Sequence, residues 1–291
     1  MIKQLLVTLY FLFLGIASAS DMQSHQSVTF YTDVPIGVLD GTKLSINIAL
    51  PAGKSAKPRP VVLMIHGGGF ISGNKDAKNP QIKKLAKLGY VSASAMYRLS
   101  PQFKFPSQID DIKLAIRFLK ANASLYNLDP KRIIVSGSSA GSYLAVMAGV
   151  TGNSSEFSKH GQFVQQDSSV RAVAAQSAPI ADFSSEKYQD ALTVQRLTNQ
   201  SSSNFFEVLT AMSPKTYLDK DDPPFFLSHG DSDPIVSVDM TREFVTELES
   251  INHPFVYYEV KNGTHSFSQS APEEAKQVFS EYLKFLRIWA E

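Results

Sequence analysis

The sequence of 291 residues contains no cysteine, a single tryptophan and almost no net charge. Without cysteine, no disulfide can hold the fold together and no thiolate can act as a nucleophile or metal ligand. The 28 Lys and Arg against 27 Asp and Glu leave a formal charge of +1, so no broad field attracts nucleic acid or an anionic membrane. Because 43% of the residues are hydrophobic, the chain can bury a large core. A small neutral partner fits this composition.

An apolar run near the amino terminus has the pattern of an export signal. Lys3 precedes an apolar run over residues 5–16, and the small residues Ala17-Ser18-Ala19 follow it. We interpret residues 1–19 as a signal peptide cleaved after Ala19, which predicts a secreted or periplasmic protein. The alternative, a membrane anchor, needs about 20 apolar residues. This run is shorter, so we expect no stable membrane insertion.

Strand patterns recur along the remaining chain. Alternating residues at 28–32 and 43–50 predict an antiparallel hairpin, joined by a turn at Asp40-Gly41. Continuous apolar runs are typical of strands that are buried on both faces, as in a parallel sheet. Six such runs follow, at residues 61–66, 91–96, 132–137, 170–176, 224–229 and 254–260.

Helical patterns lie between these strands, and the alternation predicts the fold class. The helical patterns cover residues 82–88, 109–119, 244–248 and 278–286. Alternating strands and helices predict one α/β domain over residues 20–291, with a mostly parallel, twisted, eight-stranded sheet and helices on both faces. Ligand chemistry is expected at the carboxyl ends of the strands. The polar segment 181–212 lacks a strand pattern, and we interpret it as a small lid-like insertion.

One serine lies in a G-x-S-x-G motif, Gly137-Ser138-Ser139-Ala140-Gly141, between a predicted strand and a small apolar helix. In this context the motif indicates a sharp turn that presents Ser139 as a nucleophile, with glycines where side chains would collide. The alternative is a serine and glycine turn that merely caps a helix. The distinction depends on the other groups that the chemistry needs.

A serine nucleophile needs a base, and the base needs a group that orients it. His265 follows the last predicted strand, and Asp231 and Asp233 follow the preceding one. We prefer Asp233, because a proline and two apolar residues follow it, as they follow the acid in the α/β-hydrolase fold. The order Ser139, Asp233, His265 at the carboxyl ends of strands is the order of that fold.

Three consecutive glycines in His66-Gly67-Gly68-Gly69-Phe70 follow the predicted strand at residues 61–66. Glycines let backbone N–H groups face one point, and together with the N–H of Ala140 they would form an oxyanion hole. A phosphate-binding loop is less suitable, because no Lys-Ser/Thr follows. His66 and His229 also lie at this edge, and we expect structural roles for both.

The segments that carry these motifs resemble α/β-hydrolase esterases related to the hormone-sensitive-lipase group, most closely the feruloyl and acetylxylan esterase-like branch. They are HGGGF, then YRLSPQFKFPSQIDDIKLAIRFLKANASLYNLDPKRIIVSGSSAGSYLA, SPKTYLDKDDPPFFLSHGDSDPIV and NGTHSF, within about residues 61–285. The resemblance implies the α/β-hydrolase fold and two sets of site residues. They are a catalytic triad of Ser139, Asp233 and His265, and an oxyanion hole formed by Gly68, Gly69 and Ala140.

The resemblance also implies an activity. It suggests a secreted serine carboxylic-ester hydrolase that works through an acyl-enzyme, needs no metal or organic cofactor, and acts on short-chain or aromatic acyl esters. Small esters and acetyl or feruloyl groups on polysaccharide are the candidate substrates, and no nucleic-acid partner is expected. Two alternatives remain: a serine peptidase of the prolyl-oligopeptidase type, and a non-catalytic binding module with the same fold.

Several other residues near these motifs have two interpretations. Ser138 and Ser142 stand where the family usually has an acidic residue and a glycine, which puts the local geometry in question. Arg98 with a carboxylate of Asp110-Asp111 is expected to form a buried structural pair. Three phenylalanines are core residues by default and alternative candidates for a pocket wall: Phe70, Phe183 and Phe267.

Activity should fall in acid, because a protonated histidine cannot accept the proton of the serine. From the reference histidine pKa of about 6.5, we expect the rate to be lost below roughly pH 6. A pH–rate profile on an ester substrate checks this expectation. Activity that persists in acid with Ser139 intact would contradict a histidine base.

Overall fold

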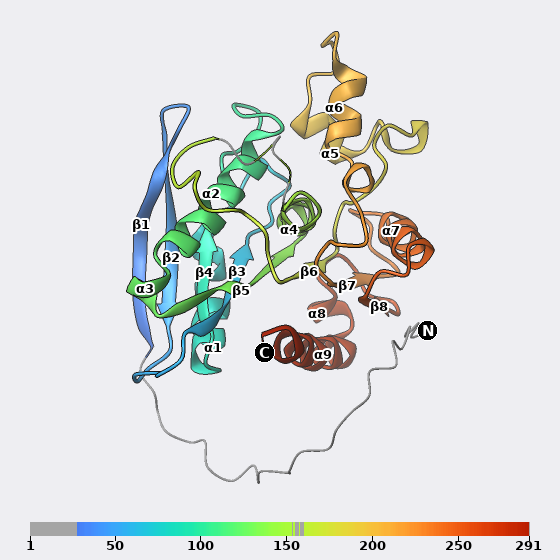
Figure 1. The fold of residues 1–291 in the computed structure, drawn as a ribbon. Helices are drawn as coiled ribbons and strands as arrows, with labels where there is room; N and C mark the ends of the chain where they lie inside the picture. The colour runs from blue at the N-terminus through green and yellow to red at the C-terminus, as the bar shows by residue number, and fades with distance from the viewer. Residues whose placement is uncertain (1–27, 153, 155–156, 158–159, 291) are drawn as a thin grey trace.

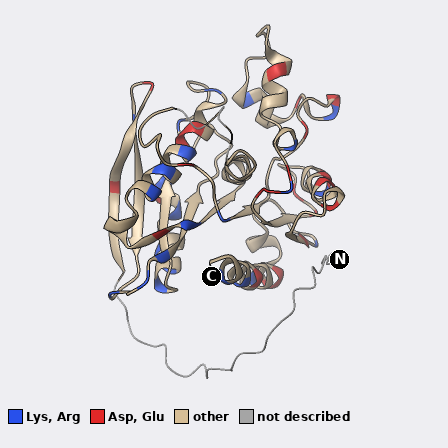
Figure 2. Cartoon of the chain, in the orientation of Figure 1, with Lys and Arg blue, Asp and Glu red and all other residues tan. Residues whose placement is uncertain are grey.

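The computed structural model describes residues 28–152, 154, 157 and 160–290 (Figure 1). The predicted signal peptide, residues 1–19, lies outside the described residues. Within them, no helix is both long enough and apolar enough to cross a membrane. Basic and acidic residues are interspersed along the ribbon, in line with the near-zero net charge (Figure 2).

The described residues form one sheet of eight strands in the order β1-β2-β4-β3-β5-β6-β7-β8. The β1–β2 and β2–β4 pairs are antiparallel, and all other neighbours are parallel. This confirms the predicted mostly parallel eight-stranded sheet. The strands are β1 (Thr29–Leu39), β2 (Thr42–Leu50), β3 (Arg59–Ile65), β4 (Val91–Ala95), β5 (Leu128–Ser138), β6 (Ala172–Gln176), β7 (Phe225–Gly230) and β8 (Phe255–Val260).

The predicted hairpin is present, but its first strand is longer than the alternation indicates. Asp40 and Gly41 have φ values of 46° and 75°, and Leu39 pairs with Thr42 across this two-residue turn. Asp and Gly tolerate such left-handed backbone. Strand β1 continues to Leu39, beyond the predicted 28–32. The alternation of apolar residues ends early in the sequence because two register shifts interrupt the pairing of β1 with β2. A bulged edge strand hides its period from sequence analysis.

Helices cover both faces of the sheet, as predicted. Alternate residues of β5 face opposite sides: Ile133 and Val135 belong to the core cluster under α2, α4 and α7, whereas Ile134 packs with residues of α9. Figure 1 shows α2 and α4 on one side and α1 and α9 on the other. The helices with predicted counterparts, or at the nucleophile turn, are α1 (Asn79–Lys87), α2 (Ser107–Ala121), α4 (Ala140–Val150), α7 (Val238–Ser250) and α9 (Pro272–Ala290).

Short helices fill several connections that sequence analysis left without structure. They are too short to show a helical period. The segment 181–212 lies between β6 and β7 and contains α5 and α6; its interpretation as a lid-like insertion stays a prediction. The short elements are α3 (Ala123–Tyr126), α5 (Leu192–Leu197), α6 (Phe205–Ala211), α8 (Phe267–Ser270) and the 3-10 turns η1 (Lys75–Lys78), η2 (Glu186–Tyr188) and η3 (Pro214–Thr216).

A buried ion pair ties the loop after β4 to helix α2. The Arg98 Nε atom lies 2.9 and 3.0 Å from the two carboxylate oxygens of Asp111, and the Arg98 backbone N–H donates to the same carboxylate at 2.7 Å. Both side chains are buried. The guanidinium also contacts Asp40 in the hairpin turn, so one side chain joins three elements. This confirms the expected structural pair.

Replacing Asp111 with alanine should destabilise the fold strongly, because it leaves the buried Arg98 charge without its main partner. The expected loss is about 3–5 kcal/mol of unfolding free energy, measured by urea denaturation. The control is Glu273→Ala, which removes an exposed carboxylate 2.7 Å from Lys276 and should change stability little. Equal losses in the two variants would contradict a structural role for the Arg98 pair.

Candidate active site

Ser139 occupies the sharp turn between β5 and α4. Its φ and ψ are 56° and −126°, a region that non-glycine residues rarely adopt and that costs of the order of 1–3 kcal/mol. The Ser139 N–H donates to the Gln176 carbonyl at 2.9 Å, and its own carbonyl accepts the N–H of Ser142 at 2.8 Å. Hydrogen bonds on both sides thus hold the strained turn. The predicted sharp turn at Ser139 is present.

The two glycines of the motif lie where backbone approaches backbone. A Cβ atom on Gly137 would stand 2.2 Å from the Gly141 carbonyl oxygen. A Cβ atom on Gly141 would stand 2.4 Å from the carbonyl oxygen of Ile65 and 2.5 Å from that of His66. Backbone atoms cannot move aside as a flexible side chain can, so neither position admits a side chain. This contact also brings the glycine-rich loop after β3 against the start of α4.

Asp233 and His265 come together at the carboxyl ends of β7 and β8. The His265 Nδ1 atom lies 2.7 Å from Asp233 Oδ2. The other carboxylate oxygen accepts the backbone N–H groups of Ile235 at 2.8 Å and Val236 at 3.1 Å. Asp231, the other candidate acid, contacts Ser232 instead. The structure therefore places the preferred aspartate beside the predicted base.

The surroundings of Asp233 stabilise its ionised form. Burial by itself would raise the pKa of Asp233. The hydrogen bonds from His229, His265 and the two backbone N–H groups outweigh burial and lower this pKa well below its usual range. Asp233 therefore stays ionised when solution acidity changes over the range in which enzymes are usually assayed.

His229 has the structural role that the sequence predicts. Its ring is fully buried, with Nδ1 2.7 Å from the Thr241 hydroxyl of α7 and Nε2 3.1 Å from Asp233 Oδ2. The same Nε2 lies 3.0 Å from the Val236 carbonyl oxygen. His229 thus fastens the Asp233 loop to strand β7 and helix α7.

The end of β6 and the residue after it connect Ser139 to His265. Gln176 accepts the Ser139 N–H, and the next residue, Ser177, donates its hydroxyl to the His265 carbonyl at 3.0 Å. The Ser177 N–H in turn donates to Ser228 of β7 at 2.8 Å. In the described contacts no direct hydrogen bond joins the Ser139 hydroxyl to the His265 ring. Such bonds are often long before substrate binds.

The glycine-rich loop after β3 lies beside Ser139. A Cβ atom on Gly67 would stand 3.3 Å from the Ser139 Cβ, and Gly68 and Gly69 have left-handed φ values of 116° and 59°. In the described part of the chain, the N–H groups of Gly68 and Gly69 have no acceptor. Ala140 is the first residue of α4, and its N–H has no acceptor within the helix because the first N–H groups of any helix lack one. These donors can stabilise an oxyanion.

His66 orders this loop, as expected. Its Nδ1 lies 2.7 Å from the Gly67 carbonyl oxygen, and its ring stacks on Tyr97 with centroids 4.2 Å apart. Burial lowers the pKa of His66. A buried ring with these contacts supports the loop.

Comparison with known proteins identifies the family of this chain. Residues 46–248, more than half of the chain, match the BD-FAE protein family. The chain belongs to the BD-FAE family. It is also 34% identical over 218 residues to a Mycobacterium tuberculosis protein named probable carboxylic ester hydrolase LipM, which covers 72% of this chain. The chain spans only 49% of the length of that relative, and 55% and 60% of two other mycobacterial relatives.

Solved structures show the α/β-hydrolase fold of this BD-FAE protein. A truncated carbohydrate esterase from gut microbiota superposes with a TM-score of 0.75 at 23% identity, covering 90% of this chain and 96% of that one. An acetyl ester-xyloside bifunctional hydrolase from Caldicellulosiruptor lactoaceticus also has a TM-score of 0.75, at 21% identity, over 88% of this chain and 95% of that one. At these identities the likeness establishes the fold alone.

A small pocket of about 50 Å³ in the BD-FAE protein opens at the predicted nucleophile. Its lining residues include Ser139, Ala140, Gly69 and Phe70, and also Arg196 of α5. Of the three phenylalanines considered, only Phe70 lines this pocket; Phe183 is buried against Tyr143, and Phe267 lines a cavity on the other side of the sheet. Nothing in the sequence around Arg196 indicates its place beside Ser139.

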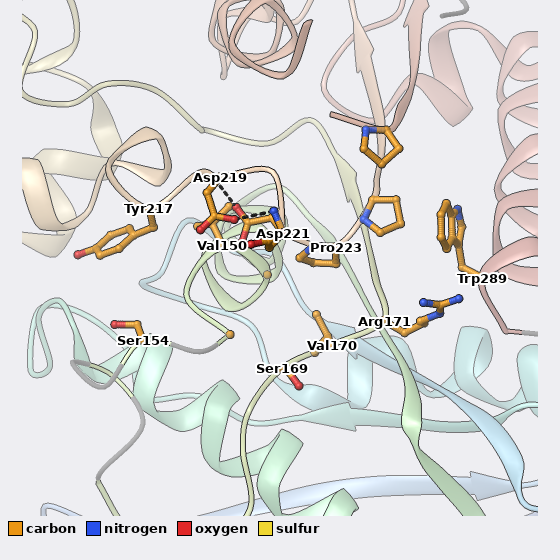
Figure 3. Close-up of a pocket in the computed structure, with 15 residues that line it drawn as sticks. Val150, Ser154, Ser169, Val170, Arg171, Tyr217, Asp219, Asp221, Pro223 and Trp289 are labelled. Atoms are coloured by element: carbon orange, nitrogen blue, oxygen red, sulfur yellow. Dashed lines mark hydrogen bonds between the residues drawn. The ribbon is translucent and has the colours of Figure 1, made fainter. Parts of the chain in front are cut away.

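A larger pocket of about 650 Å³ lies at the other end of the strands, where β6 and β7 begin. Figure 3 shows Asp219 and Asp221 on one side of it, and Arg171 beside Trp289 on the other. No histidine is among its lining residues, so it offers no base for a serine. In the described residues, no group of three His, Cys, Asp or Glu side chains is placed to hold a metal ion. The volume of a pocket therefore does not by itself identify the candidate active site.

The strained turn gives a stability prediction. Glycine adopts positive φ without penalty, so Ser139→Gly should be more stable than Ser139→Ala by about 1 kcal/mol, measured by urea denaturation. The control is the same pair of variants at Ser138, which lies in regular strand β5. There the alanine variant should be the more stable one. The same ranking at both positions would contradict strain at Ser139.

Proposed function

We propose that this protein is a serine carboxylic-ester hydrolase that works through an acyl-enzyme. The observation that carries the proposal is the buried Asp233 carboxylate, 2.7 Å from His265, at the sheet edge where the turn presents Ser139. The name of the relative LipM, a carboxylic ester hydrolase, supports the reaction class. The alternatives, a peptidase and a binding module, have no specific observation in their favour.

In the proposed reaction, His265 accepts the Ser139 proton while the serine oxygen attacks the ester carbonyl carbon. The N–H groups of Gly68, Gly69 and Ala140 donate to the oxyanion that forms. The tetrahedral intermediate collapses, and the alcohol leaves with the proton from His265. Water, deprotonated by His265, then attacks the acyl-enzyme and releases the acid and free Ser139.

Asp233 acts on the proposed base, not on the substrate. Its low pKa keeps it ionised, so it accepts the Nδ1 proton of His265 and leaves Nε2 free to receive the serine proton. The negative charge also stabilises the imidazolium that forms in each step. Because His229 and the loop amides already hold the carboxylate, it needs no rearrangement during the reaction.

Short acyl groups suit the pocket beside Ser139. A volume of about 50 Å³ is enough for an acetyl group, whereas a feruloyl ring would have to extend out of it. Two structural neighbours have titles that name a carbohydrate esterase and an acetyl ester-xyloside hydrolase. We therefore propose acetyl esters, free or on polysaccharide, as substrates. Export by the predicted signal peptide at residues 1–19 would place the enzyme where such polysaccharides occur.

The nucleophile can be tested with a panel of p-nitrophenyl acetate, methyl ferulate, acetylated xylan and an aminoacyl-p-nitroanilide. Ser139→Ala and His265→Gln should each lower kcat on the esters by about 10⁴-fold or more, because each removes a member of the proposed triad. The matched control, Ser138→Ala, should stay close to wild type.

Equal turnover by wild type and Ser139→Ala would reject the proposed nucleophile. Preferential cleavage of the anilide would support the peptidase, and no turnover of any substrate would support the binding module. Hydrolysis of p-nitrophenyl acetate but not of acetylated xylan would keep the ester hydrolase and reject the polysaccharide substrate.

A further inference from the structure

Arg196 brings a positive charge to the pocket beside Ser139. It lies on α5, in the segment between β6 and β7, and lines the same pocket as Ser139 and Ala140. Its Nη1 atom donates to the Gly69 carbonyl at 3.2 Å. A Cβ atom on Gly69 would stand 2.0 Å from this Nη1, so the guanidinium packs directly against the glycine backbone.

The position of Arg196 is built into the fold. Its backbone carbonyl accepts the Ser100 hydroxyl and the Lys104 ammonium, the latter at 2.8 Å. The neighbouring Leu197 carbonyl accepts the Phe105 N–H at 2.9 Å. Three contacts from the loop between β4 and α2 therefore hold this end of α5. The Arg196 guanidinium therefore projects from a helix whose end is anchored, and its position is not that of a loose surface side chain.

The charge of Arg196 has no partner of opposite sign in the described ranges, since no carboxylate there lies within ion-pair distance of it. Among the described residues only Nη1 of this guanidinium donates to an acceptor, which leaves its Nε and Nη2 edge available. That edge has the fork geometry that binds a carboxylate with two parallel hydrogen bonds. Lys104, bonded to the same residue, adds a second positive charge nearby.

We infer that Arg196 selects ester substrates that carry a carboxylate near the scissile ester. The inference rests on the proposed ester hydrolysis at Ser139 and adds a substrate class to it. The carboxylate can belong to the acyl part or to the alcohol part of the ester, as in a half-ester of a diacid or an acetylated sugar acid. Either would place negative charge on the free edge of Arg196 while the carbonyl reaches Ser139.

The experiment compares charged and neutral esters of matched length. The acyl pair is monomethyl adipate and methyl hexanoate, and the alcohol pair is 4-acetoxybutanoate and butyl acetate. The kcat/KM of each is measured for wild type, Arg196→Gln and the control Lys187→Gln. Lys187 lies in the same insertion, is exposed and pairs with Glu243, so its variant makes the same charge change away from the pocket.

Wild type should favour the charged member of at least one pair, which identifies the part that carries the carboxylate. In Arg196→Gln the charged-to-neutral ratio of kcat/KM should fall by about 10- to 100-fold, as expected for a hydrogen-bonded ion pair. Lys187→Gln should leave the ratio within about twofold. Added salt should weaken the preference in wild type.

Three results would overturn the inference. One is a charged-to-neutral ratio that Arg196→Gln leaves unchanged. Another is an equal loss on both members of a pair, which would mean that Arg196 only braces the Gly69 carbonyl. The third is hydrolysis of the neutral esters alone. If wild type hydrolyses p-nitrophenyl acetate but none of the four esters, this inference fails and the proposed ester hydrolysis stands. If it hydrolyses none of the five, the proposed function fails as well.

Discussion

The arrangement of the site depends on the buried carboxylate of Asp233. It accepts hydrogen bonds from His229, His265 and two backbone N–H groups of its own loop. A buried charge is tolerated only when such partners replace water. The carboxylate therefore holds strand β7, the loop after it and the loop after β8 in one arrangement. The orientation of His265, and with it the proposed chemistry at Ser139, follows from that arrangement.

A second constraint is steric and concerns the backbone around Ser139. Strand β5, helix α4 and the loop after β3 approach so closely that Gly137 and Gly141 have no room for a side chain. Ser139 remains in a strained conformation because the surrounding hydrogen bonds determine its backbone. The close approach also brings the free N–H groups of Gly68 and Gly69 next to the serine. Packing thus places the glycine-rich loop beside Ser139, and the glycines permit this packing.

The sequence was sufficient for the fold class and for most of the candidate site. Long elements can be recognised in the sequence. A strand that is buried on both faces is a continuous apolar run, and a helix that is buried on one face has apolar residues at the helical period. The choice of Asp233 over Asp231 agrees with the contact to His265. The sequence did not predict the full length of the bulged strand β1 or the four short helices, because a short or irregular element shows no period. These helices have four to seven residues and are α3, α5, α6 and α8.

By itself, the sequence determined which side chains could do chemistry and in which order they occur, since motif spacing and the alternation of strands and helices are local properties. Only the tertiary structure decided what surrounds them. The contact of Asp233 with His265, the link from Gln176 and Ser177 to Ser139 and His265, and the place of Arg196 against Gly69 all join residues distant in the chain. Contacts of this kind arise from packing of the whole domain, so no local pattern of residues specifies them.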